Sequence, residues 1–198
     1  MKKTIVMIWL MLLLIIVGAL FWYNEWVYQL PTPVPKNYKT VNIGEVIELN
    51  SQLKKLNNNP LFLHFFNPDC PCSRFNIKNF KSLVAQYKTQ VNFIVVVVSH
   101  KTFTVNSIQN KFNLDIPILF DNSIASSCGV YSTPQAVLID KEHKLYYRGN
   151  YNRSRYCTDE KTNYAKMAIT GLLNQHTRLT FSQFALKAYG CQLPDCTQ

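Results

Sequence analysis

Residues 65–73 of the chain read Phe-Phe-Asn-Pro-Asp-Cys-Pro-Cys-Ser and join two segments of different periodicity. Residues 61–66 form an apolar run interrupted only by His64, which is typical of a strand buried on both faces of a sheet. In residues 73–87 the apolar side chains recur at helical spacing. The stretch therefore predicts a strand that ends shortly before Cys70 and a helix that begins close to it.

This predicted junction favours thiol chemistry at Cys70. The first backbone N–H groups of a helix have no partner within it, and together with the helix dipole they stabilise a thiolate. A thiolate attacks disulfides, and a second nearby thiol then releases the mixed disulfide. Cys72 is the nearest candidate for the second thiol. The sequence thus predicts a thiol–disulfide exchange centre in which Cys70 attacks a disulfide and Cys72 resolves the mixed disulfide.

After residue 39, the rest of the chain alternates predicted strands and helices. Further strands are predicted at 40–49, 91–98, 116–120, 135–140 and 145–148, the last two as a hairpin. Further helices are predicted at 51–56, 103–112, 158–173 and 181–188. This order predicts an α/β fold with a mixed central sheet flanked by helices.

A second segment, residues 131–140, reads Tyr-Ser-Thr-Pro-Gln-Ala-Val-Leu-Ile-Asp. With residues 65–70 it resembles the thioredoxin-like superfamily, especially membrane-anchored TlpA-like redoxins, from about residue 47 to residue 173. The resemblance implies a thioredoxin-like fold and a cis bond between Thr133 and Pro134, facing Cys70. It also implies that Thr133 and Pro134 bind the extended peptide of a substrate.

The chain departs from the pattern of this family at its second cysteine. The family has Cys-x-x-Cys, whereas here Ser73 takes the second position and Cys72 lies one residue earlier. A disulfide across one intervening residue closes a tighter ring, and strain favours reduction. The Cys-Pro-Cys pair is therefore expected to act as an oxidant or isomerase. If it does not close, Cys70 needs another resolving thiol.

Four further cysteines are candidates for structural disulfides. We expect a stapling bridge between Cys128 and Cys157, with an electron-relaying pair as the alternative. Cys191 and Cys196 are expected to close a small terminal loop. Six cysteines allow 15 complete pairings, so sequence leaves the connectivity open.

His64 lies six residues before Cys70, where the resemblance implies a buried acid in many thioredoxins. An imidazole at that position could shuttle protons during exchange, because its ordinary pKa is about 6.5. We therefore include His64 among the candidate catalytic residues. A core histidine bonded to a neighbouring group is the alternative interpretation.

The N-terminus predicts one transmembrane helix. Lys2 and Lys3 precede residues 5–23, which contain no charge, and aromatic residues cluster at the far end of this run. A helix of that length crosses the hydrocarbon layer of a membrane, and positive residues stay cytoplasmic. The apolar run exceeds the core of about 7–15 residues typical of a cleaved signal peptide, which remains the alternative. We expect a retained, single-pass signal anchor.

The chain divides accordingly into four predicted parts. They are a cytoplasmic tip and anchor (1–28), a proline-rich tether (29–39), a thioredoxin-like domain (40–176) and a C-terminal helix with a cysteine-containing tail (177–198). The domain is expected outside the cytoplasm, on the inner or cytoplasmic membrane, and in the periplasm of a Gram-negative cell. The formal net charge is +10, but lysines and arginines form no dense basic run, which excludes an obvious nucleic-acid site.

The sequence favours a membrane-anchored thiol–disulfide oxidoreductase that acts on protein thiols or disulfides without a cofactor. The alternative is a copper-binding chaperone resembling the Sco type, in which Cys70, Cys72 and a histidine, most plausibly His100, bind Cu(I). A peroxidase fits less well, because Leu63 and Asn67 occupy the positions where peroxiredoxins need proline and threonine. A redox-inert binding module stapled by its cysteines is the last alternative.

Overall fold

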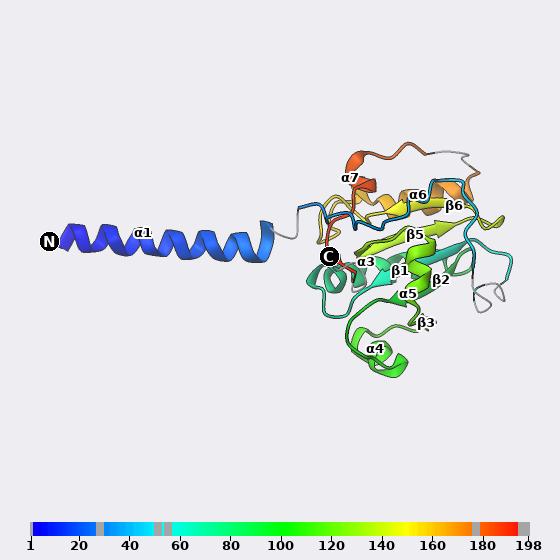
Figure 1. The fold of residues 1–198 in the computed structure, drawn as a ribbon, viewed down its shortest axis with the longest axis horizontal. Helices are drawn as coiled ribbons and strands as arrows, with labels where there is room; N and C mark the ends of the chain where they lie inside the picture. Colours follow the sequence, from blue (N-terminus) through cyan, green and yellow to red (C-terminus); the bar gives the residue numbers. More distant parts are fainter. Residues whose placement is uncertain (1, 27–29, 50–52, 54–56, 176–178, 194–198) are drawn as a thin grey trace.

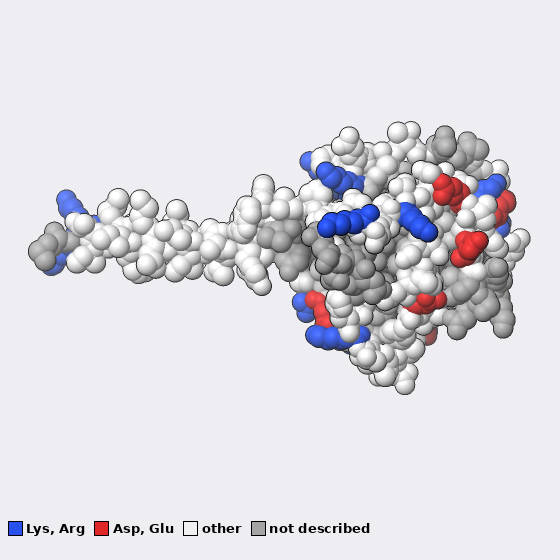
Figure 2. All heavy atoms as spheres, in the orientation of Figure 1, with Lys and Arg blue, Asp and Glu red and all other residues white. Residues whose placement is uncertain are grey.

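The computed structural model describes residues 2–26, 30–49, 53, 57–175 and 179–193. Its first element is the helix α1 (Lys2–Phe21), continued by a short π-helical segment, η1 (Trp22–Trp26), and it extends away from the folded domain (Figure 1). The span Lys2–Trp26 has a hydropathy of 2.9, and none of its most apolar window is buried. Figure 2 shows lysine side chains at its outer tip and a shaft without charge. By length and composition, this helix can cross a membrane.

The central sheet has five strands in the order β3-β2-β1-β5-β6. These strands are β1 (Leu61–Phe66), β2 (Asn92–Val97), β3 (Ile118–Leu119), β5 (Gln135–Ile139) and β6 (Leu145–Gly149). The middle strand β1 pairs in parallel with β2 and antiparallel with β5. The edge strand β3 is parallel to β2, and the edge strand β6 is antiparallel to β5. The predicted mixed sheet is confirmed, and its topology is thioredoxin-like.

Helices cover the sheet in the order that the apolar periodicity predicts. They are α3 (Pro71–Tyr87), α4 (Val105–Phe112), α5 (Asn122–Ser127), η3 (Glu160–Thr162), α6 (Tyr164–Leu173) and α7 (Gln183–Leu186). The short helix α5 was not expected from the sequence. Most of the helix expected at 51–56 lies outside the described residues.

The strand expected at 40–49 is wrong. This segment turns at Gly44, whose φ of 91° lies in the left-handed region that glycine tolerates. It then forms an isolated bridge between Val46 and Lys144, with backbone hydrogen bonds to residues 143 and 145, but no strand. Ile47 is nevertheless buried, so the apolar pattern of the segment reflects packing on the domain rather than membership of the sheet.

Two hydrophobic cores lie on the two faces of the sheet, because successive residues of a strand point to opposite sides. Phe62 and Phe66 of β1 belong to the first core, with α3 and α6. Leu63 and Phe65 belong to the second core, with α5. The strand β1 is buried at every position, which explains why five of its six residues are apolar.

His64 is the one polar residue of β1, and it lies on the side of the first core. It is fully buried, and its ring stacks on Phe80 at a centroid distance of 4.3 Å. Its Nδ1 atom shares a hydrogen bond of 2.7 Å with the hydroxyl of Tyr151. Burial lowers the pKa of His64 from 6.5 to about 3, because the charged imidazolium loses its hydration. The ring is therefore neutral near pH 7.

This depressed pKa predicts acid sensitivity. In the unfolded chain His64 binds a proton below about pH 6.5, whereas in the folded chain it does so only near pH 3, so stability is lost as the pH falls between these values. His64→Phe keeps an aromatic ring against Phe80 but cannot bind a proton. We expect the unfolding free energy of the wild type to fall relative to this variant by up to about 1.4 kcal/mol per pH unit.

The measurement is guanidinium unfolding of both full-length proteins in detergent micelles, followed by near-ultraviolet circular dichroism at several pH values in this range. The difference between the two proteins isolates His64 from the other titrating groups. A difference that stays constant with pH would show that the buried imidazole does not resist protonation.

Candidate active site

Cys70 lies at the point where β1 ends and α3 begins, as predicted. It is the N-cap residue of α3, with an extended backbone (φ −77°, ψ 122°), and Pro71 occupies the first helical position. Asn67 shapes the connecting loop, because its carbonyl accepts the Cys70 N–H at 3.1 Å and its side chain accepts the Asp69 N–H at 3.0 Å. The start of the helix thus faces the Cys70 sulfur with its positive dipole end.

The carboxylate of Asp69 carries the only acidic charge within this loop, and it has its own partner. Lys101 Nζ lies 3.1 Å from Asp69 Oδ2, at the surface. This pairing reduces the repulsion that an adjacent carboxylate exerts on a thiolate. The loop therefore leaves the helix terminus as the main electrostatic influence on Cys70.

The second motif meets the first across the sheet. Thr133 ends the short strand β4 (Ser132–Thr133), and the bond from Thr133 to Pro134 is cis. The carbonyl oxygen of Thr133 lies 3.6 Å from the sulfur of Cys70. The cis bond implied by the family resemblance is therefore present, and it faces the predicted nucleophile.

The partner of Cys70 is not the one that the sequence suggested. Cys70 forms a disulfide with Cys191, across a Cα–Cα distance of 6.1 Å. Cys72 is a free, fully buried thiol. Cys70 is the extended residue before the helix, whereas Cys72 is a helical residue whose side chain is fully buried. The expected Cys191–Cys196 loop is likewise wrong for Cys191, and Cys196 lies outside the described residues.

Cys191 reaches Cys70 on a segment that covers the cis-proline loop. Residues 188–193, here called the strap, include the strand β7 (Cys191–Gln192), which pairs antiparallel with β4. In this pairing Cys191 lies opposite Thr133, and Gln192 lies opposite Ser132. The N–H of Leu193 also donates to the carbonyl of Tyr131.

The proline-rich tether holds the other edge of the strap. Pro31 forms a bridge with Tyr189, and the Thr32 N–H donates to the carbonyl of Ala188 at 2.9 Å. The Thr32 and Ser132 hydroxyls share a hydrogen bond of 2.9 Å across the strap. The strap is thus the middle strand of a small three-stranded arrangement.

Cys128 and Cys157 do not form the expected bridge. Both are free thiols, Cys128 packed in the second core and Cys157 against the first. The sheet separates the two cores, so no disulfide can join them. Burial raises the pKa of each thiol to about 12, and neither is therefore a thiolate near neutral pH.

Cys72 and Cys157 lie in one buried cluster on the first-core side of α3. Asn76 Nδ2 donates to the sulfur of Cys157 at 3.1 Å. Burial raises the pKa of Cys72, and the nearby Arg155 guanidinium offsets part of this rise. In this structure Cys72 is thus a buried thiol beside a cation, and its predicted role as a resolving thiol is untested.

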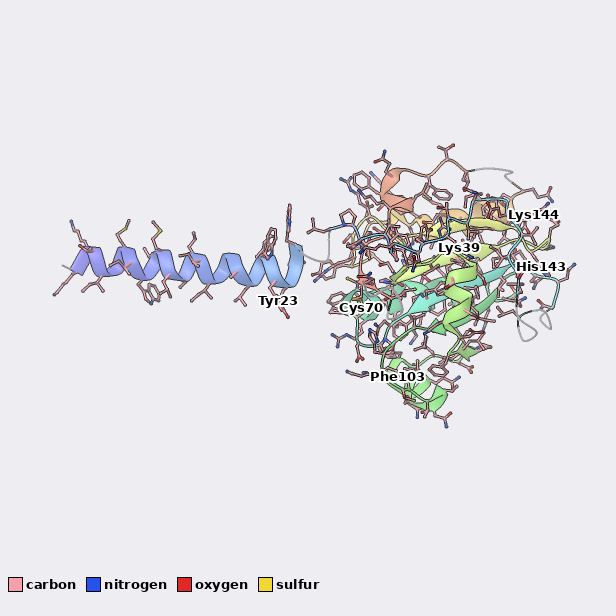
Figure 3. The ribbon with its side chains drawn as sticks, viewed as in Figure 1. Tyr23, Lys39, Cys70, Phe103, His143 and Lys144 are labelled. Carbon is pink, nitrogen blue, oxygen red and sulfur yellow. A yellow bond between two sulfur atoms is a disulfide. The ribbon has the colours of Figure 1, made fainter. Side chains whose placement is uncertain are left out.

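The same arginine connects the site with the end of the N-terminal apolar helix. Arg155 Nη2 lies 3.0 Å from Glu25 Oε1, and the Tyr156 hydroxyl donates to the same oxygen at 2.7 Å. Figure 3 shows Cys70 at the end of the domain that faces α1, whereas His143 and Lys144 lie at the opposite end. The predicted active site therefore faces the anchor.

A hollow of about 640 Å³ opens beside the strap. Its lining contains three basic side chains (Arg153, Arg155 and Lys187), one carboxylate (Asp159) and three aromatic rings (Tyr156, Phe184 and Tyr189). The excess of positive charge favours acidic groups at this face.

No metal site accompanies the thiols in the part of the chain that the structure describes. Within these residues, no three histidine, cysteine or acidic side chains lie together as a ligand set. His100 is exposed, whereas His64 is buried in the first core. The copper-chaperone interpretation therefore stays an untested prediction.

Of the predicted site residues, the structure brings together Cys70, Thr133 and Pro134. Cys72 lies on the other side of the helix start, and His64 lies in the core beneath it. Sequence reasoning missed Cys191 as the disulfide partner and Thr32 as its neighbour. Neither carries a local signal, because their contacts join positions that are about 60 to 160 residues apart.

Comparison with known proteins places the fold but not a function. A hypothetical protein from Sinorhizobium meliloti matches with 17% identity and a TM-score of 0.63, over 79% of this chain and 96% of that one. An uncharacterised conserved protein from Geobacillus kaustophilus matches with 19% identity and a TM-score of 0.59, over 81% and 91%.

A more distant match is the thioredoxin domain of a thiol-disulfide oxidoreductase from Bacteroides vulgatus. It has 14% identity and a TM-score of 0.48, over 62% of this chain and 98% of that one. No curated protein matches the sequence. One family model matches residues 41–193, which include the strands of the sheet, Cys70 and the strap. The protein therefore belongs to this family, which is described as a domain of unknown function (DUF6436).

Proposed function

We propose that this protein is a membrane-anchored thiol–disulfide oxidoreductase that exchanges disulfides with other proteins outside the cytoplasm. The observation that carries the proposal is the position of Cys70. It caps a helix, faces the cis Thr133–Pro134 bond and is already joined to a second cysteine, Cys191. This combination supplies a stabilised thiolate, a surface for an extended peptide and a resolving thiol.

The proposed exchange transfers two electrons between the cysteine pair and the substrate. In the reduced protein the Cys70 thiolate attacks one sulfur of a substrate disulfide, and the other substrate sulfur leaves as a thiolate. The Cys191 thiolate then attacks Cys70, which releases the substrate as a dithiol and restores the Cys70–Cys191 bond. The reverse sequence oxidises a substrate dithiol, and the reduction potential of the pair decides the direction.

Cys191 replaces Cys72 as the resolving residue in this proposal. Cys72 is a free thiol with no exposed surface, whereas Cys191 is already bonded to Cys70. His64 does not act as a charged proton shuttle in this scheme, because its pKa of about 3 keeps it neutral.

The first test is a redox titration of the full-length protein in detergent against glutathione. We expect one two-electron couple in the wild type and its complete loss in Cys70→Ser and in Cys191→Ser. Cys72→Ser should retain the couple, because Cys72 is not bonded in the oxidised state. Cys128→Ser serves as the matched control, since it removes a buried thiol from the opposite face of the sheet.

Loss of the couple in Cys72→Ser together with its retention in Cys191→Ser would assign the exchange to the Cys-Pro-Cys pair instead. No titratable couple in the wild type would refute the proposed function itself. Metal analysis of anaerobically purified protein would then test the copper alternative.

The second test concerns the orientation of the anchor. Positive residues remain on the cytoplasmic side, so Lys2 and Lys3 should place the domain outside the cytoplasm. In bacterial cells producing the full chain, protease added to spheroplasts should digest the domain without lysis. The double substitution Lys2→Glu and Lys3→Glu should reduce the digested fraction, because it removes the charge bias.

The matched control is Lys88→Glu with Lys111→Glu, which changes the same charge within the domain and should leave the digested fraction unchanged. Protection of the wild-type domain in intact spheroplasts would contradict an extracytoplasmic site.

A further inference from the structure

We infer that the strap occupies the binding site of the polypeptide substrate, and that the sequence of the strap indicates which substrate segments this site binds. This inference rests on the proposed function and specifies its substrate class. The preferred substrate is an extended segment with glycine directly before its cysteine and an apolar residue two positions after it. In the chain itself, Gly190, Cys191 and Leu193 fill these three positions.

The first argument is the backbone pairing. The strap adds to β4 as an antiparallel strand, directly beside the cis Thr133–Pro134 bond, and its cysteine is bonded to Cys70. An incoming substrate must bring its own sulfur to the same atom. Strand addition at an open sheet edge supplies main-chain hydrogen bonds for any extended segment, whatever its side chains.

Gly190 gives the second argument, which concerns sequence. A Cβ atom at this position would lie 2.2 Å from the carbonyl oxygen of Thr133, and the φ of Gly190 is +124°. Both the space and the backbone conformation exclude other residues without a shift of the strap. The clash is with backbone beside the reactive sulfur, so it applies equally to a foreign segment that adopts this pairing.

The third argument is the apolar position after the cysteine. Leu193 is 6% exposed, packs in the second core and donates its N–H to the carbonyl of Tyr131. A polar side chain at this point would have to be buried without compensation. The site thus offers one apolar pocket at a fixed distance from the sulfur.

The tether borders the strap on the side opposite β4. Thr32 binds the carbonyl of Ala188, three residues before the cysteine, and reaches Ser132 across the strap. A substrate segment held in the same way would pair at both edges from three residues before its cysteine to two residues after it. The disulfide locks the strap in this position, and after its reduction the strap still competes at high effective concentration, because it is part of the same chain.

The experiment uses the full-length Cys191→Ser protein in detergent, in which Cys70 is a free thiol. The probe is the hexapeptide of residues 188–193, Ala-Tyr-Gly-Cys-Gln-Leu, whose cysteine carries thionitrobenzoate in a mixed disulfide. Attack by the Cys70 thiolate on the peptide sulfur forms the protein–peptide disulfide and releases coloured thionitrobenzoate. The same protein with Cys70→Ser gives the background from all other thiols.

We expect peptides carrying the Gly190→Ala or the Leu193→Asn change to react about tenfold more slowly than the parent, the scale on which one clashing methyl group or one lost apolar contact commonly acts. A peptide of reversed sequence should be equally slow. In the protein, adding Gly190→Ala to Cys191→Ser should displace the strap and raise the rate with the parent peptide several-fold.

Equal rates for all peptides would overturn the inferred substrate pattern while leaving the proposed function intact. The thionitrobenzoate disulfide of glutathione separates the two cases, because it needs no strand pairing. If Cys70 fails to react even with this small probe, the proposed function fails, and the inference fails with it. If Gly190→Ala in the protein lowers the peptide rate, the strap does not compete for the substrate position.

Discussion

The active-site geometry depends on the antiparallel pairing of β1 with β5. In this register Phe65 lies opposite Gln135, so the end of β1 meets the beginning of β5 at one edge of the sheet. The next residues along the chain in each direction are the loop to Cys70 and the cis Thr133–Pro134 bond. Two segments more than 60 residues apart thus converge on one sulfur atom. A register slip of one residue between β1 and β5 would turn every β1 side chain to the other face of the sheet and move the Cys70 loop away from the cis-proline loop.

Elements defined by local patterns could be predicted from the sequence. The apolar run of β1, the helical spacing of α3 and the two motifs around Cys70 and Pro134 were sufficient to predict the sheet, the fold and the approach of Cys70 to the cis-proline loop. The segment 40–49 was predicted wrongly, because an apolar pattern records burial and does not distinguish a strand from a coil packed on the domain. Disulfide partners failed for a different reason. Pairing depends on which face of the sheet and which side of a helix each thiol occupies.

The cysteines illustrate this second limit. In the sequence, Cys128 and Cys157 both lie close to segments at the active-site end of the sheet. In the fold, they pack in different cores on opposite faces of the sheet. Cys70 and Cys72 are neighbours in sequence, but Cys72 is a free, buried thiol within the helix. Cys191, which is 121 residues from Cys70, meets it because the strap adds to β4. Strand addition therefore determines the disulfide partner of Cys70 more strongly than proximity in sequence does.

The strap and the N-terminal apolar helix together restrict what can reach Cys70. The strap lies between β4 and the tether, and the tether follows that helix in the sequence. Arg155 adds a second link, since it contacts Glu25 at the end of that helix and also lies beside the Cys72 thiol. Under the proposed function, a substrate must therefore present an extended segment close to the membrane surface, on the side that faces α1. A compact protein far from the membrane cannot do so, and the long tether does not relieve this limit because Pro31 and Thr32 are already paired with the strap.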